Sequence, residues 1–268
     1  MSEVRVSMPT EHENRHDIEL GLGLLTLLLL LLIGGAIVRS AIATRLDGFT
    51  IDEAYHIAAG VSYVRHSDFR INPEHPPLVK LWVGSLISAT GFHLSNLRPF
   101  ADKADERNFT EDDVYFNNDF NSVQRRARIA MWTLNGLLLV FFAFAVHRTF
   151  GPGVALGTLI FLAIDPTVAA HLPVVMTDLP VSLLSGSAVV LAVSAFRGWA
   201  WKDLLMCSLA LGLALATSPC SCHTRLAVRG FALRSLREAL DRFDCRADHS
   251  VGFLSVPICG KQFRIRSL

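Results

Sequence analysis

The sequence predicts a mainly α-helical membrane protein, a polytopic bundle of about five spans with a long helical first extracytoplasmic loop. Hydrophobic residues make up 51% of the 268 residues, and charged residues make up only 18%. The mean hydropathy is +0.39, and the apolar residues are gathered in long runs rather than spread along amphipathic elements. This distribution excludes a disordered chain and an ordinary soluble domain.

The charge balance argues against a nucleic-acid-binding protein. Lys and Arg together number 25 against 24 Asp and Glu, so the formal net charge is +1. No global basic field is therefore present to attract a polyanion. Four of the five cysteines lie in the last fifth of the chain, which does not resemble the disulfide framework of a small secreted protein.

Five apolar runs are the predicted spans. The first, residues 18–38, is long enough to cross a hydrocarbon core of about 30 Å at 1.5 Å per residue. A cleaved signal peptide is the alternative for this run, but its apolar core would be about 7 to 15 residues long. The other runs are residues 129–146, 154–164, 179–195 and 204–216. The run at 154–164 is short and reaches spanning length only by tilting or by including residues 165–170.

Basic residues in the short loops predict the orientation. His147 and Arg148 follow the second run, and the segment 197–202 follows the fourth, so both are placed on the cytoplasmic side. The N-terminal segment 1–17 is then cytoplasmic as well. Two loops, residues 39–128 and 165–178, are expected on the outer face of a plasma (inner) membrane.

The first outer loop contains a helical motif, DEAYHIAAG, at residues 52–60. In a helix, Asp52, Tyr55 and His56 share one face because of their three-and-four spacing. Asp52 is thus a candidate for chemistry, with Tyr55 and His56 as candidate substrate contacts. The alternative is that Asp52 only caps the helix, because acidic residues are common at helix N-termini.

The same loop continues with NPEHPPLVKLW at residues 72–82. Its three prolines predict an extended segment, and Pro77 can begin a helix that runs to about Ala89. Lys80 falls in the first turn, where a cation opposes the helix dipole unless an anion is bound. A phosphate site is one interpretation. A lysine that snorkels to the membrane surface beside Trp82 is the other.

The second outer loop ends at Asp178, where the fourth run begins. This carboxylate either caps a helix or faces the first loop. Together with Asp52, His56 and His171, it can supply a general base or bind a hard divalent cation. The spacing forms no recognisable zinc signature, so no metal ligands are assigned. Proton transport is less favoured, since relay carboxylates lie near the middle of spans.

These motifs resemble those of the polytopic GT-C glycosyltransferases that use polyprenyl-phosphate sugars. This family, glycosyltransferase family 39, includes the protein O-mannosyltransferases and the bacterial aminoarabinose lipid A transferases. The resemblance rests on DEAYHIAAG at 52–60, NPEHPPLVKL at 72–81 and AHLPVVMTDLP at 170–180, and it covers roughly residues 18–217.

The resemblance implies an inverting transferase at the extracytoplasmic membrane face. The partners would be a polyprenyl-phosphate-linked sugar donor, a protein, lipid or glycan acceptor, and membrane lipid. By similarity the catalytic residues are Asp52, Glu53 and Asp178, Lys80 holds the donor phosphate, and His75 and His171 are candidate contacts. A non-catalytic membrane protein that binds lipid phosphates or partner helices is the alternative function.

The resemblance stops near Thr217. Residues 218–268 are rich in arginine and cysteine and contain no long apolar run, whereas the family pattern implies further spans. We therefore expect a reading-frame shift near Thr217, a truncated transferase and reduced activity of this chain. The alternatives for the tail are a basic amphipathic helix at 226–243 and a zinc site at Cys220, Cys222, Cys245 and His249.

Overall fold

The computed structural model describes residues 11–218, which are mainly helical and contain no β-strand. The helices are α1 (Glu11–Ala43), α2 (Glu53–His66), α3 (Pro77–Ser88), α4 (Lys103–Glu111), a π-helix (Asp112–Phe116), α5 (Phe120–Phe150), α6 (Pro152–Ile164), α7 (Pro166–His171), α8 (Asp178–Gly198) and α9 (Trp201–Leu215). Residues 1–10 and the tail from 219 onward, with its predicted helix and zinc ligands, lie outside the described residues. The prediction of a mainly α-helical fold is confirmed.

Three described helices are long and apolar enough to cross a membrane. They are α1, through its segment Gly23–Ala43, together with α5 and α8. The runs predicted as the third and fifth spans also form helices, but α6 has 13 residues and α9 has 15. At 1.5 Å per residue they measure about 20 Å, less than the hydrocarbon core of about 30 Å. The structure therefore supports three of the five predicted spans, those in α1, α5 and α8.

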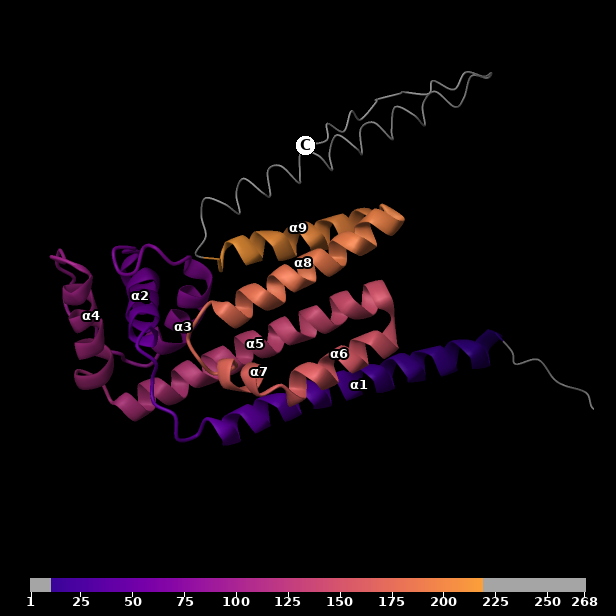
Figure 1. The fold of residues 1–268 in the computed structure, drawn as a ribbon, viewed down its shortest axis with the longest axis horizontal. Coiled ribbons are helices and arrows are strands. Elements are labelled where there is room, and N and C mark those ends of the chain that lie inside the picture. Colours follow the sequence, from indigo (N-terminus) through magenta and orange to yellow (C-terminus); the bar gives the residue numbers. More distant parts are fainter. Residues whose placement is uncertain (1–10, 219–268) are drawn as a thin grey trace, which may run out of the picture. The chain divides into compact units, whose positions relative to one another are not determined.

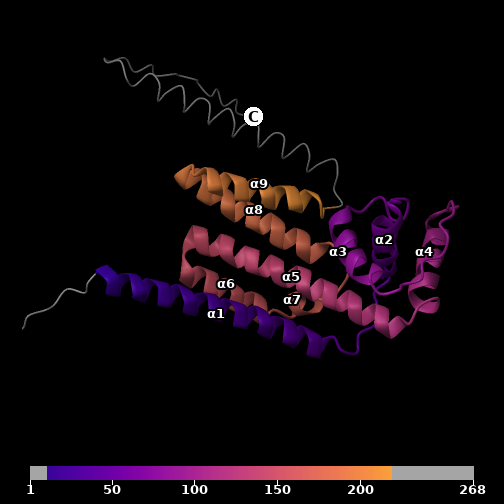
Figure 2. The same cartoon turned by 180° about the vertical axis from the view of Figure 1, so that it is seen from behind.

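The long helices lie side by side. Figures 1 and 2 show α1, α5, α6, α8 and α9 running next to one another, with α2, α3 and α4 gathered at one end of this set. Within the set, α5 contacts α1, α6 and α8, and α9 packs on α8. The first predicted outer loop is thus at the end where α5 begins, because α2, α3 and α4 all belong to it.

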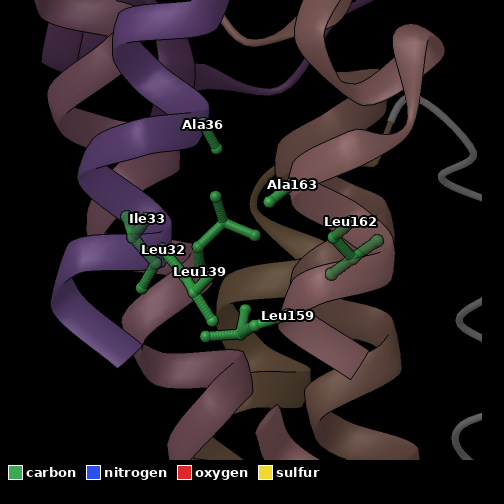
Figure 3. Close-up of a pocket in the computed structure, with 7 residues that line it drawn as sticks. All are labelled: Leu32, Ile33, Ala36, Leu139, Leu159, Leu162 and Ala163. Carbon is green, nitrogen blue, oxygen red and sulfur yellow. The ribbon is translucent and has the colours of Figure 1, made fainter. Parts of the chain in front are cut away.

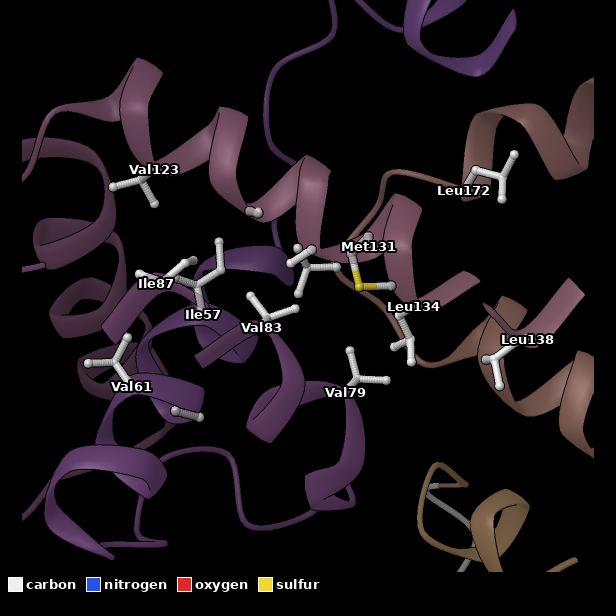
Figure 4. Packing of buried hydrophobic residues seen from close by; sticks show 14 of the residues in the cluster. Ile57, Val61, Val79, Val83, Ile87, Val123, Met131, Leu134, Leu138 and Leu172 are labelled. Carbon is white, nitrogen blue, oxygen red and sulfur yellow. The ribbon is translucent and has the colours of Figure 1, made fainter. Parts of the chain in front are cut away.

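The helices of the first outer loop have a core of their own that continues into α5. Val79, Val83 and Ile87 recur every four residues on α3, so they form one apolar stripe. Figure 4 shows this stripe facing Ile57 of α2 and the side chain of Met131 on α5. All five side chains are buried, so this loop is a packed helical layer.

Two glycines allow α2 and α3 to cross at very short range. A Cβ atom on Gly60 would lie 2.2 Å from the carbonyl oxygen of Lys80, and one on Gly84 would lie 2.2 Å from the backbone of Gly60. Any larger side chain would therefore have to separate the two helices. This contact explains the glycine that ends the first-loop motif.

Where α1, α5 and α6 meet, the long helices pack with little open space. Figure 3 shows a small cavity where α1, α5 and α6 meet. Its volume of about 10 Å³ is lined only by apolar side chains: Leu32, Ile33, Ala36, Leu139, Leu159, Leu162 and Ala163. A buried water needs at least that much space and polar partners. The cavity is therefore a packing gap rather than a binding site.

Candidate functional site

Asp52 stands at the N-cap position of α2, but its side chain accepts no capping hydrogen bond. The capping role falls to Glu53, whose Oε1 accepts the backbone N–H of Thr50 at 2.8 Å. The Asp52 side chain is exposed, and it has no hydrogen-bond or ion-pair partner among the described residues. The geometry therefore favours a free carboxylate over the simple cap that the sequence left open.

Glu53 is fully buried and forms the centre of a hydrogen-bonded junction. Its Oε2 accepts Nη1 of Arg128 at 2.5 Å and the backbone N–H of Val175 at 3.0 Å, and its Oε1 accepts Nη2 of Arg128 at 3.1 Å. With the bond from Thr50, both carboxylate oxygens are fully engaged. Glu53, which the resemblance placed among the catalytic residues, thus has no free oxygen to accept a proton and fits a positioning role.

Arg128 is a residue of this junction that the sequence motifs did not indicate. Beyond its ion pair with Glu53, Nη1 donates to the carbonyl of Pro173 at 2.8 Å, and Nη2 donates to the carbonyl of Gly48 at 2.9 Å. It therefore joins the first outer loop, α5 and the second outer loop. The one signal in the sequence is an arginine between Ala127 and Ile129, directly before a predicted span.

Further hydrogen bonds from the long helices hold the second loop. Nη1 of Arg39 donates to the carbonyl of Ala163 at 2.7 Å, and the hydroxyl of Ser40 donates to the carbonyl of Ala169 at 2.7 Å. On α5, Nδ2 of Asn135 donates to the carbonyl of Leu172 at 2.8 Å. These bonds give donors to carbonyls in the last turn of α6, in α7 and directly after α7, next to an apolar core.

Asp178 is the first residue of α8 and is exposed. In sequence it follows three residues after Val175, whose N–H binds Glu53, and Asp52 directly precedes Glu53. His171 is held in α7 by a contact of 2.8 Å between its Nδ1 and the carbonyl of Thr167. Asp52 and Asp178 are thus close in sequence to residues of one junction, and His171 is engaged within its own helix.

Lys80 is fully buried, unlike the open phosphate ligand that the first-turn argument predicted. Its Nζ donates to the carbonyl of Asn72, to the carbonyl of His75 at 2.7 Å and to the hydroxyl of Tyr63 at 3.1 Å. An ammonium has three donors, and here all three meet protein oxygens. In this state Lys80 fixes the turn at 72–75 against α2 and α3. The extended segment predicted here is wrong, since Asn72 has a φ of 51° and its carbonyl accepts the N–H of His75 at 3.3 Å.

Two imidazoles lie beside this ammonium. The rings of His56 and His75 meet edge to face with centroids 5.2 Å apart. His56 is almost completely buried, and the Nδ1 atoms of both rings have no hydrogen-bond partner among the described residues. Burial, with the Lys80 charge as a smaller cause, lowers the pKa of His56 to about 3, so this ring is neutral at physiological pH.

Tyr55 lies at the outer edge of the same polar cluster, against α4. Its hydroxyl donates to the backbone carbonyl of Lys103 at 3.2 Å, and Nζ of Lys103 lies 4.6 Å from the centre of its ring. Lys103 is ion-paired with Glu74 and, at 3.0 Å, with Glu106. Tyr55 therefore contacts α4 through Lys103, and this contact engages its hydroxyl.

The buried ammonium predicts a specific pH dependence of stability. Burial lowers the pKa of Lys80 from 10.5 to about 8. Between these values the unfolded chain binds more protons at this group than the folded chain does, so the free energy of unfolding should rise as the pH rises from about 8. Above pH 10 the pKa of Tyr63, raised to about 12 by burial, acts in the opposite direction.

Thermal unfolding in detergent at pH 8 to 10 measures this effect. We expect Lys80→Met to remove the rise that the wild-type protein shows, whereas Lys202→Met, at an exposed lysine, should keep it. An identical pH profile for wild type and Lys80→Met would contradict the buried, depressed lysine.

No group of three or more His, Cys, Asp or Glu side chains within residues 11–218 is arranged to hold a metal ion. The divalent cation expected from the sequence therefore has no ready-made set of protein ligands in this part of the chain. Comparisons with protein-family models, with curated proteins and with solved structures found no match.

Proposed function

We propose that the protein is an integral membrane glycosyltransferase of the GT-C type. It would move a sugar from a polyprenyl-phosphate donor to a protein, lipid or glycan acceptor at the extracytoplasmic face of the plasma membrane. The observation that supports this most is Asp52, an exposed carboxylate without a partner among the described residues, next to the junction built on Glu53. The shorter helices α6 and α9 would complete a five-span topology.

The proposed reaction needs a base close to the acceptor. The bond between the anomeric carbon of the sugar and the phosphate oxygen breaks, and the phosphate leaves with the electron pair. The acceptor oxygen forms the new bond to that carbon, and its proton passes to the Asp52 carboxylate. Asp178, the second exposed carboxylate, would orient the acceptor.

Charge that develops on the leaving phosphate must also be stabilised. Because all three donors of Lys80 meet protein oxygens, we assign it first to holding the segment at 72–75. His75 belongs to this segment, and its Nδ1 has no partner among the described residues. His75 and the neighbouring backbone are therefore the proposed phosphate contacts, with Lys80 positioning them.

Replacement of Asp52 with asparagine tests the proposal. We expect the transfer rate from a radiolabelled polyprenyl-phosphate sugar to fall about 10²-fold or more, since the amide cannot accept the acceptor proton. Donor binding and protein level should stay unchanged. Asp47→Asn, at an exposed carboxylate in the same loop, is the matched control and should keep the wild-type rate.

Undiminished transfer by Asp52→Asn would overturn the base role. A wild-type chain that binds the donor but transfers nothing would instead support the second candidate, a non-catalytic membrane component that binds lipid phosphates or partner helices. One observation favours that candidate: only 17% of the most apolar window of α1 is buried within the described structure. Such a face requires lipid or another helix to cover it.

A further inference from the structure

A second site lies between α1 and α5, away from the outer loops. A cavity of about 510 Å³ separates the two helices, within the usual range for ligand pockets of roughly 300–1,000 Å³. Its walls are largely apolar and include Leu25, Leu29 and Ile33 of α1 and Val140, Ala143 and Phe144 of α5. Both helices are membrane-span candidates, so an occupant of this groove must be apolar over most of its length.

One end of the groove is basic. His147 and Arg148, in the last turn of α5, complete its lining. The guanidinium of Arg148 is paired with Asp203 at 3.2 Å, yet the Arg148 side chain remains 50% exposed. The Nδ1 of His147 is buried without a hydrogen-bond partner among the described residues. Arg197 lies close by, since its Nη1 donates to the carbonyl of Thr149.

The dimensions of the groove fit a lipid chain better than a helix. Its lining on α1 runs from Leu25 to Ile33, about 12 Å at 1.5 Å per residue. The volume divided by this length gives a cross-section of about 40 Å², roughly half that of a helix 10 Å across. An acyl chain is thinner than a helix and carries no backbone polar groups that would need partners.

We propose that this groove binds an anionic phospholipid. Its acyl chain lies between α1 and α5, and its phosphate meets the guanidinium of Arg148 and the imidazole of His147. The charge complementarity supports this choice, because basic pockets between membrane helices on the cytoplasmic side attract anionic headgroups. The site is independent of the glycosyl transfer proposed above, which uses the opposite end of α5.

Native mass spectrometry of the full chain tests the site. The purified protein is mixed in mild detergent with equal amounts of phosphatidylglycerol and phosphatidylcholine that carry the same acyl chains. We expect the wild type to retain phosphatidylglycerol preferentially. Arg148→Gln should weaken that preference about fivefold, whereas Arg148→Lys should keep it. Arg45→Gln, which removes an exposed charge at the other end of α1, should have no effect.

A larger side chain placed in the groove provides a second, independent test of the site. Val140→Trp should abolish retention of both lipids, because Val140 lines the cavity. Leu137→Trp, at an exposed residue on the same helix outside the cavity, is the matched control and should bind as the wild type does. A thermal unfolding midpoint for each variant shows that binding is compared between folded proteins.

Three outcomes would overturn the proposal. The first is equal retention of the two lipids by the wild type, and the second is undiminished lipid binding by folded Val140→Trp. The third is a lipid-free dimer that Val140→Trp dissociates, which would make the groove a contact between two copies of the chain.

Discussion

Replacing Gly60 with alanine is expected to destabilise the protein by about 3 kcal/mol, the upper end of the usual cost of overpacking. The added Cβ would lie 2.2 Å from the carbonyl oxygen of Lys80 and 3.0 Å from the amide nitrogen of Gly84. Both are backbone atoms, so no side-chain rotation can relieve the clash. Helices α2 and α3 would have to separate, which would open the core around Val79 and Val83.

The measurement is thermal unfolding in detergent, followed by tryptophan fluorescence. Trp82 on α3 is a suitable reporter, since its Nε1 donates to the carbonyl of Ala130 on α5. Gly157→Ala in α6 is the matched control, because its Cβ would meet nothing within 4 Å. Alanine has the higher helix propensity, so this control should be neutral or stabilising by up to about 1 kcal/mol. Equal midpoints for the two variants would contradict the crossing.

Helix positions were largely predictable from local signals. Pro77 begins α3 as a first-turn proline, and the helix ends at Ser88, one residue before the predicted end. The acidic residues at 52 and 53 mark the start of α2. Both signals act within one turn of the helix and need no knowledge of the rest of the chain.

Helix lengths were less predictable, because they depend on contacts between distant segments. Helix α5 begins at Phe120, before the apolar run, and its first turns are covered by the first outer loop, with Val123 and Ala127 buried. By contrast, α6 does not extend beyond the predicted run and ends at Ile164, because the side chain of Asp165 caps the following helix, α7. Hydropathy detects the apolar run but not what packs on the turns beside it.

The sequence predicted the residues of the candidate site but not the hydrogen bonds that those residues form. The sequence placed Asp52 and Asp178 at helix starts and Lys80 in a first turn, and all three positions agree with the structure. It could not show that Lys80 is enclosed by three oxygens, or that Glu53 binds Arg128 and Val175. The Glu53 bonds join residues far apart in sequence, and the Lys80 bonds depend on how the turn at 72–75 folds, which periodicity and spacing do not detect.

Breaking the buried ion pair between Arg128 and Glu53 is expected to cause a large loss of folding stability. Arg128→Met should destabilise the protein by about 3–5 kcal/mol, because it leaves the fully buried Glu53 carboxylate without its counter-charge. The carbonyls of Gly48 and Pro173 would also lose their donors, which should loosen both outer loops. The readouts are the thermal unfolding midpoint and the rate of limited proteolysis within residues 165–178.

A double variant separates the effect of the buried charge on stability from the effect of the lost hydrogen bonds. Glu53→Gln combined with Arg128→Met removes both charges, so it should recover part of the stability lost in Arg128→Met alone. The recovery should be incomplete, since the loop carbonyls still lack their donors. Arg70→Met is the matched control, because Arg70 is exposed and its partner Asp68 is only half-buried, so only a small change is expected. If Arg128→Met were no more destabilising than Arg70→Met, the junction would not hold the two loops together, and the proposed shared site of Asp52 and Asp178 would be contradicted as well.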